Sequence, residues 1–293
     1  MCGIFGFTGR SSWKTSVLLQ SLCIEDEVRG KHSTGIVIQS DNECLIQKKA
    51  LRGKDFVSKG YTDFLFKKRY GLALGHNRYA TTGAVNDRNA HPFGTRVANG
   101  WNFGVHNGIV GGKEKIAESY GIPEPEVDSE IVFRAIAKMQ NSGMDVVDAI
   151  ENITEFISAD ADFAFAYLDT KERTTYLWRS PERPLAILDA RRLGLGRWFC
   201  STKDIFATAW SNLRGSPGDI RKVTYFEAIP YRLYKVIFDD VYEVEPIRDL
   251  RRKSRREEKK FFDFREDDYR DSRESEIYTR KWRWKSGLLF PED

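Results

Sequence analysis

The pattern of apolar and polar residues divides the chain into a strand-rich beginning, a helical middle and a strand-rich second half. Short apolar or alternating segments bounded by turn residues are typical of strands. The strands expected on this basis are Cys2–Thr8, Thr34–Gln39, Glu43–Lys48, Gly71–His76, Phe103–His106, Phe163–Asp169, Thr174–Arg179, Leu185–Asp189, Trp198–Ser201 and Tyr231–Phe238.

Helices are expected where apolar residues recur every three or four positions. The predicted helices are Lys14–Val28, Lys54–Tyr70, Lys113–Tyr120, Asp128–Asn141 and Val146–Ile157. Arg29–Ser33 and Asn77–Pro92 are expected to be loops, and Asn107-Gly108 a turn that ends a strand. Strands followed by helices and again by strands predict a layered α+β domain, in which helices cover sheets.

Composition separates this domain from its C-terminal end. The chain has 293 residues, of which 47 are basic and 43 acidic, and 41% are hydrophobic, as in an ordinary globular protein. Charged residues account for 31 of the 55 residues in 239–293 and for 59 of the 238 before them. We therefore expect a packed domain over 2–238 and a charged tail over 239–293, either a solvated helix or a partner-binding segment. Because the tail mixes both signs of charge, a nucleic-acid partner is not expected.

The chain carries no predicted membrane span or signal peptide. No apolar run approaches the roughly 18–20 residues that a membrane helix needs, and the first residues lack a basic start and a long apolar stretch. A cytoplasmic protein is therefore expected. Cys2, Cys23, Cys44 and Cys200 show no metal-binding spacing. They are expected to be free thiols, and neither a metal nor an organic cofactor is expected.

The position of Cys2 suggests nucleophilic chemistry. Removal of Met1 would leave a thiol and a free α-amine on one residue, and a free α-amine has an ordinary pKa of about 7.7–8.0. Such an amine can take the proton of the thiol, so one residue would supply both nucleophile and base. The alternative is that Cys2 is an inert residue of the first strand.

Four further residues suit acyl transfer. Asn107 and Gly108 can offer a side-chain amide and a backbone N–H to an oxyanion. Arg78 can hold a carboxylate through two hydrogen bonds, and Asp128 can hold an ammonium group. Taken singly, each has a simpler explanation: an ordinary Asn-Gly turn, a surface charge, or for Asp128 the N-cap of a helix.

Together these residues resemble the class II glutamine amidotransferase domain, nearest to that of glucosamine-6-phosphate synthase and amidophosphoribosyltransferase. The segments that carry the resemblance are Cys2–Gly6, Arg29-Gly30, Ser33–Gly35, Gly75–Gly83, Asn89–Pro92, Val105–Ile109 and Asp128–Glu130. The resemblance implies the four-layer αββα sandwich of N-terminal-nucleophile hydrolases, and hydrolysis of glutamine to glutamate and ammonia. Weaker likeness continues to about residue 238.

The resemblance also implies a role for each matching residue. Cys2 would be the nucleophile, and Asn107 and Gly108 would form the oxyanion hole. Arg78 would bind the α-carboxylate of glutamine with help from Thr81, and Asp128 would bind the α-ammonium group. Arg29 and Gly30 would lie beside the nucleophile and order it, with Gly30 at the substrate. The matching histidines are interpreted as structural; they are His76, His91 and His106.

Two positions depart from the glucosamine-6-phosphate synthase pattern. Thr82 stands where that pattern has His, and Tyr79 stands where it has Trp. Thr82 lies on the lid side of the site, so the departure concerns coupling to a second domain and not the thiol chemistry.

About 55 charged residues follow the domain, too few for an ammonia-consuming synthase domain. The sequence therefore predicts a stand-alone glutaminase that passes ammonia to a separate synthase protein, with Arg248–Trp284 as a candidate docking segment. Two alternatives stay open. One is a related amidase acting on another γ-glutamyl amide, and the other is a non-catalytic regulatory or binding protein on the same fold.

Overall fold

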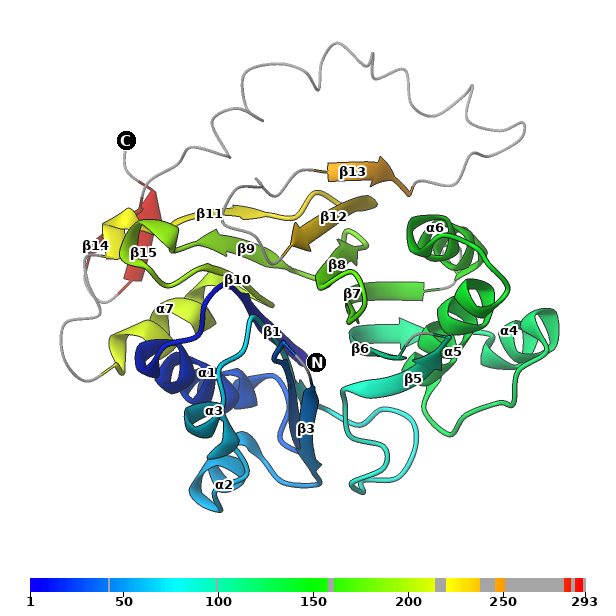
Figure 1. Ribbon diagram of the computed structural model, residues 1–293, viewed down its shortest axis with the longest axis horizontal. Helices are drawn as coiled ribbons and strands as arrows, with labels where there is room; N and C mark the ends of the chain where they lie inside the picture. The colour runs from blue at the N-terminus through cyan, green and yellow to red at the C-terminus, as the bar shows by residue number, and fades with distance from the viewer. Residues whose placement is uncertain are drawn as a thin grey trace, which may run out of the picture.

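The computed structural model describes residues 1–41, 43–98, 100–157, 161–213, 220–237 and 246–250, with two short strands near the C-terminus. Two antiparallel sheets lie face to face at the centre of these residues (Figure 1). The two short strands, β14 (Trp282–Lys285) and β15 (Leu288–Pro291), pair with each other in a separate ribbon.

The first sheet has seven strands in the order β11-β9-β10-β1-β4-β2-β3. Their bounds are β1 (Gly3–Thr8), β2 (Ser33–Gln39), β3 (Cys44–Lys49), β4 (Leu72–Arg78), β9 (Ala186–Asp189), β10 (Arg197–Cys200) and β11 (Thr224–Glu227). β1 therefore lies at the middle of the sheet, between β10 and β4.

The second sheet has six strands in the order β13-β12-β8-β7-β6-β5. Their bounds are β5 (Phe93–Val97), β6 (Gly100–Val110), β7 (Ala161–Asp169), β8 (Thr174–Arg179), β12 (Arg232–Ile237) and β13 (Pro246–Asp249). β6 is the longest strand of this sheet, and it pairs with β7 over nine residues.

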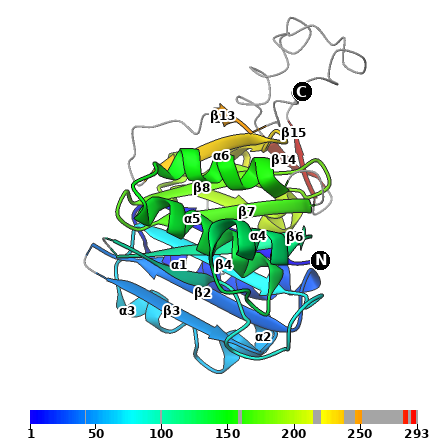
Figure 2. The ribbon, with the colours of Figure 1, turned by 90° about the vertical axis from the view of Figure 1, so that its right-hand side faces the viewer.

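Helices cover the outer face of each sheet (Figure 2). The first sheet is covered by α1 (Trp13–Glu25), α2 (Gly53–Ser58), α3 (Phe64–Lys67) and α7 (Lys203–Ser211), and the second by α4 (Lys113–Tyr120), α5 (Asp128–Asn141) and α6 (Val146–Ile157). Short 3₁₀ turns follow at Asp26–Val28, Arg191–Leu193 and Ile220–Lys222. The predicted four-layer αββα sandwich is confirmed.

Alternation along β1 explains why the sequence supports these layers. Ile4 packs between the two sheets, whereas Phe5 and Phe7 point the other way, into the layer under α1 and α7. All three side chains are fully buried. A central strand buried on both faces is a fixed platform for the residue that precedes it, which is Cys2.

Several sequence-based expectations for the elements were wrong. The single helix over Lys54–Tyr70 is two short helices, separated by a turn in which Gly60 adopts a φ of 78°. The turn at Asn107-Gly108 is instead part of β6, because pairing with β7 continues through Val110. β5, α7 and β11 were not predicted.

The beginning of the charged tail pairs with the second sheet. β13 extends β12 at the edge of that sheet, and Leu250 is buried in the layer under α6. Arg248 forms ion pairs with Asp148, at 2.7 Å, and with Glu151 of α6. Residues 246–249 are therefore extended and not helical. Residues 251–281, for which a helix or docking segment is expected, lie outside the described residues.

Candidate active site

Cys2 lies directly before β1 and is held from two sides. Its backbone N–H donates a hydrogen bond to Oδ1 of Asn107, at 3.0 Å, and its carbonyl accepts one from Nε of Arg29, at 2.8 Å. Asn107 comes from the second sheet, and Arg29 from the end of the 3₁₀ turn that follows α1. Three elements that are far apart in the sequence therefore converge on the predicted nucleophile.

The sulfur of Cys2 contacts the backbone at the end of β4. The N–H of Tyr79 donates to Sγ at 3.3 Å, and the carbonyl of Tyr79 lies 3.5 Å from it. Burial raises the pKa of the Cys2 thiol, whereas this N–H, the N-terminal ammonium group and Arg78 lower it. Asp128 raises it slightly further. The site therefore holds donors and positive charge that favour the thiolate against the cost of burial.

Asn107 carries a free donor next to the nucleophile. Its Oδ1 is occupied by Cys2, but its buried Nδ2 has no hydrogen-bond partner among the described residues. Buried amide groups in folded proteins are nearly always paired. An unpartnered donor beside a nucleophilic sulfur is the arrangement that stabilises an oxyanion.

Gly108 occupies a position that other residues cannot adopt. Its φ is 152°, and a Cβ atom there would lie 1.8 Å from the carbonyl oxygen of Asp162. Because Gly108 has no side chain, β6 can stay paired with β7 beyond Asn107. The role of the Gly108 N–H as a second oxyanion donor stays a prediction.

Arg78, the last residue of β4, braces the loop that follows it. Its guanidinium donates to the carbonyls of Thr82, Gly83 and Ala84, the last at 3.1 Å. Its side chain is buried, and burial lowers the pKa of Arg78, while Cys2 and Asp128 raise it. The predicted carboxylate-binding group is therefore in the site, but its donors are engaged by the 82–84 turn.

Asp128 links the same turn to the second sheet. Its Oδ2 accepts the N–H of Val110 at 2.8 Å, and its Oδ1 accepts the hydroxyl of Thr82 at 3.0 Å. The alternative interpretation of Asp128 as an N-cap is wrong, because Val127 is the N-cap and Asp128 is already the first residue of α5. Its carboxylate is thus directed toward the site.

Thr81 and Gly30 lie in different surroundings: Thr81 is exposed, and Gly30 is packed against the end of β4. Thr81 is exposed, and no hydrogen bond of its side chain is found in the described part of the chain. Gly30 approaches the strand end closely, since a Cβ atom there would lie 2.5 Å from the carbonyl carbon of Arg78. Gly30 therefore allows the turn after α1 to pack against β4, and the substrate-binding roles of both residues stay predictions.

Four contacts at the site were not predicted from the sequence. The backbone of Tyr79 contacts the sulfur of Cys2, and the Thr82 hydroxyl contacts Asp128. His32 accepts the N–H of Ala80 at 2.8 Å and stacks on the Tyr79 ring at 4.8 Å between centroids. A backbone contact leaves no signal in a sequence, but His32 stands two residues after Gly30, within reach of the motif.

The three motif histidines are buried in the framework behind the site. Burial lowers the pKa of His76 to about 3, that of His106 to about 4, and that of His91 well below its usual value. His76 Nε2 lies 2.8 Å from the His106 carbonyl, and His106 Nδ1 lies 2.8 Å from Ser129 Oγ. These neutral rings join β4 to β6 and α5, which supports their structural interpretation.

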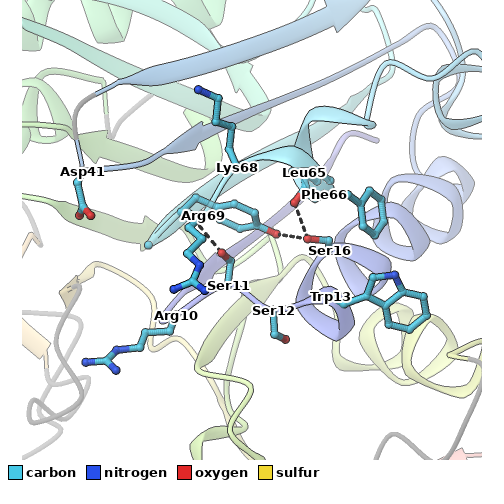
Figure 3. Close-up of a pocket in the computed structure, with 12 residues that line it drawn as sticks. Arg10, Ser11, Ser12, Trp13, Ser16, Asp41, Leu65, Phe66, Lys68 and Arg69 are labelled. Carbon is cyan, nitrogen blue, oxygen red and sulfur yellow. Dashed lines mark hydrogen bonds between the residues drawn. The ribbon is translucent and has the colours of Figure 1, made fainter.

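A cavity of about 740 Å³ lies away from these residues (Figure 3). It opens beyond the end of β1 opposite to Cys2 and is lined by Arg10, Trp13, Phe66 and Arg69, among others. No predicted site residue lines it.

The described residues form neither a metal-binding cluster nor a membrane-spanning helix. No group of three or more His, Cys, Asp or Glu side chains is placed to hold a metal ion there. None of the helices described is both long and apolar enough to cross a membrane. Cys2, Cys23, Cys44 and Cys200 are free thiols.

Comparison with known proteins identifies relatives that match about two thirds of the chain. No family model matches it. It is 30% identical to the glutamine–fructose-6-phosphate aminotransferase [isomerizing] of Streptococcus pyogenes over 191 residues. The match covers 64% of this chain and 30% of that enzyme. It is 28% identical to the enzyme of the same name from Staphylococcus aureus over 205 residues, which are 68% of this chain and 31% of that enzyme. The chain thus spans about a third of the length of these curated relatives.

Solved structures share the fold. The glutamine phosphoribosylpyrophosphate amidotransferase of B. subtilis, solved with ADP and GMP, matches 84% of this chain with 49% of its own, at a TM-score of 0.63 and 22% identity. A structure described as the allosteric regulatory enzyme of purine biosynthesis matches the same shares at a TM-score of 0.65 and 22% identity. At this identity the two structures establish the fold alone.

Proposed function

We propose that this chain is a class II, N-terminal-nucleophile glutamine amidotransferase that hydrolyses L-glutamine to glutamate and ammonia. Its likeness to two glutamine–fructose-6-phosphate aminotransferases supports the proposal. The thiolate of Cys2 is the nucleophile, and the α-amine of the same residue is the base. One observation carries the proposal: Asn107 holds the nitrogen of Cys2 with its Oδ1 and keeps its buried Nδ2 free beside it.

Maturation precedes the reaction: an aminopeptidase removes Met1, which is 63% exposed. The amine set free on Cys2 stays within reach of Asn107 Oδ1, because the same nitrogen already lies 3.0 Å from it. It takes the thiol proton, directly or through a water, and leaves a thiolate next to the Tyr79 N–H.

The thiolate then attacks the side-chain carboxamide carbon of glutamine and forms a C–S bond. The oxyanion that results is stabilised by Asn107 Nδ2 and by the Gly108 N–H. Collapse of this intermediate breaks the C–N bond, and the protonated amine of Cys2 gives its proton to the leaving nitrogen, so that ammonia departs. A water, deprotonated by the same amine, cleaves the thioester and releases glutamate.

Arg78 and Asp128 fix the other end of the substrate. Arg78 pairs with the α-carboxylate and Asp128 with the α-ammonium group, with Thr81 and Gly30 beside them. Both charged groups are near Cys2, since each affects the pKa of its thiol. Glutamine must displace part of the 82–84 turn from Arg78, because that turn now occupies the guanidinium.

The ammonia passes to a synthase, which we propose is a separate protein. Support comes from the charged composition of residues 239–293, in which 31 of 55 residues are charged. Arg248–Trp284 is the segment proposed to dock the synthase. Affinity purification from the native host should recover an amidotransferase partner, and a tag on a chain that ends at residue 250 should not recover it.

A coupled assay of glutamate and ammonia tests the activity. The purified protein should lack Met1 by intact mass and should release both products in equal amounts, faster from glutamine than from other γ-glutamyl amides. Cys2→Ala should abolish turnover, whereas the matched change Cys44→Ala, at a half-buried cysteine of β3, should not. Turnover by Cys2→Ala, or by a chain that retains Met1, contradicts the proposal.

A further inference from the structure

A carboxyl group lies directly behind the nucleophile, and none of the roles above uses it. Asp26 opens the 3₁₀ turn that follows α1, and its side chain is completely buried. It packs against Gly3, the residue after Cys2, so closely that a Cβ atom on Gly3 would lie 1.8 Å from Asp26 Oδ2. Gly3 therefore leaves the space that this carboxyl fills.

Asp26 is buried without the donors that an ionised carboxylate needs. Neither of its oxygens has a hydrogen-bond partner among the described residues. The charged or titratable groups that face it are Arg29 and the thiols of Cys23 and Cys200. Burial raises the pKa of Asp26 well above its usual value, and Arg29 lowers it only in part. A carboxylate in such surroundings is costly, and a buried setting without donors favours the protonated form.

Asn77 supplies a complementary acceptor in the same layer. It is paired with Gly3 across β1 and β4, and its Nδ2 donates to the carbonyl of Cys23 at 2.8 Å. Its Oδ1 is buried and has no donor in the described part of the chain. Asp26 and Asn77 thus each leave a buried acceptor without a donor near Gly3, and a proton on Asp26 would supply a donor that these surroundings lack.

The state of Asp26 matters for Arg29. Arg29 uses its Nε to hold the Cys2 carbonyl at 2.8 Å. An ionised Asp26 would attract the same guanidinium away from this carbonyl, whereas a neutral Asp26 does not compete for it.

We propose that Asp26 is a positioning residue for the nucleophile. As a neutral carboxylic acid it supports the Cys2–Gly3 backbone from behind and leaves Arg29 free to hold the Cys2 carbonyl. The proposal rests on the proposed function for its effect on turnover, but its effects on thiol reactivity and on stability do not depend on glutamine.

The first test compares two substitutions of Asp26 in the mature full-length protein. Asp26→Asn is a neutral isostere that keeps a donor, and Asp26→Val is close in size but apolar. The value of kcat is calculated per active site, counted by reaction with a glutamine-analogue diazo-ketone. Asp26→Asn should keep this kcat within about twofold, while in Asp26→Val it should fall tenfold or more. KM for glutamine should change by less than about threefold in both, because Arg78 and Asp128 are untouched.

Alkylation of Cys2 by iodoacetamide gives a readout without substrate. Its rate should be preserved in Asp26→Asn and should fall in Asp26→Val. A tenfold loss in Asp26→Asn would mean that an ionised carboxylate is required, and an unchanged Asp26→Val would mean that Asp26 positions nothing. Either result overturns the proposal. If the unaltered protein alkylates normally but does not hydrolyse glutamine, the proposed function fails and this one stands.

The second test measures melting temperature against pH. The unfolded chain releases the Asp26 proton near pH 3.9, the ordinary value for Asp. The folded protein keeps it to higher pH, so the contribution of Asp26 to stability falls as the pH rises above about 4. The gain in melting temperature of Asp26→Asn over the unaltered protein should therefore be larger at pH 8 than at pH 5. The exposed control Asp63→Asn should show no such trend, and a flat difference for Asp26→Asn would overturn the proposal.

Discussion

The two halves of the candidate site are built from different kinds of structure. The nucleophile half uses strands: Cys2 is fixed at the start of β1, and Asn107 lies within the nine-residue pairing of β6 with β7. The anchoring half uses the loop after β4, whose 82–84 turn is held by Arg78 and Asp128. The first half is preorganised by sheet hydrogen bonds, whereas the second is held by the groups that would bind the substrate.

This difference predicts a division of labour. Changes in the strand half should affect the chemical step, because they alter a catalytic geometry that is already in place before glutamine binds. Changes in the loop half should affect binding, because glutamine and the loop compete for the same side chains. Four substitutions test this division, in order of decreasing effect.

Asn107→Ala should have the largest effect. It removes the free Nδ2 donor and the acceptor for the nitrogen of Cys2. Loss of one oxyanion donor costs about 10²–10³ in kcat, and KM should change little. Steady-state glutaminase kinetics check this. A kcat within threefold of the unaltered protein would remove Asn107 from the oxyanion hole.

Arg78→Lys should weaken glutamine binding. Lysine keeps the charge but loses the planar pair of donors, so KM should rise by roughly tenfold or more. The melting temperature should also fall, since the brace on the 82–84 carbonyls is lost. Binding of glutamine to the Cys2→Ala protein, measured by calorimetry, separates affinity from turnover. Unchanged affinity would contradict the anchoring role.

Thr82→Val should have the opposite effect on binding. It removes the hydroxyl that occupies Asp128 Oδ1 and keeps the shape of the side chain. Because the α-ammonium group then meets no competitor, KM should fall by about threefold to tenfold. Thr82→Ser retains the hydroxyl and should behave like the unaltered protein. A rise in KM for Thr82→Val would show that Thr82 orients Asp128 for the substrate.

His91→Leu tests the framework under both halves. The pKa of His91 is held well below 6.5 in the folded protein, so the unfolded chain takes up a proton that the folded one does not as the pH falls through 6.5. Stability is therefore lost on acidification, by about 1.4 kcal/mol per pH unit for each such histidine. Denaturant titrations between pH 6.5 and 5 give the free energy of unfolding against pH. Its slope should be shallower in His91→Leu by the equivalent of one proton. An unchanged slope would mean that His91 is not buried in its neutral form.

Much of the strand half could be predicted from the sequence. The apolar start of the chain indicates a buried strand. Cys2, Asn107 and Gly108 stand in motifs that can be recognised from the sequence. The pairing of Asn107 with the nitrogen of Cys2 joins residues 105 positions apart, and only the folded sheets bring them together. The turn expected at Asn107-Gly108 was wrong because local residue preference gave way to the pairing of β6 with β7.

The loop half was predicted less well. Arg78 and Asp128 were identified by their charges, but nothing in the sequence indicates that backbone carbonyls occupy Arg78 or that Thr82 contacts Asp128. Asp26 was missed because one acidic residue near a helix end ordinarily means an exposed charge or a cap. Its burial depends on the absence of a side chain at Gly3, which a pattern of hydrophobicity does not record.

The most direct test is to label the mature protein with a diazo-ketone analogue of glutamine and to map the modified peptide by mass spectrometry. The account predicts a single adduct on the sulfur of Cys2, in a chain that begins at Cys2, with loss of turnover in proportion to labelling. Labelling of Cys23, Cys44 or Cys200 in its place, or full labelling and turnover in chains that still carry Met1, would contradict it.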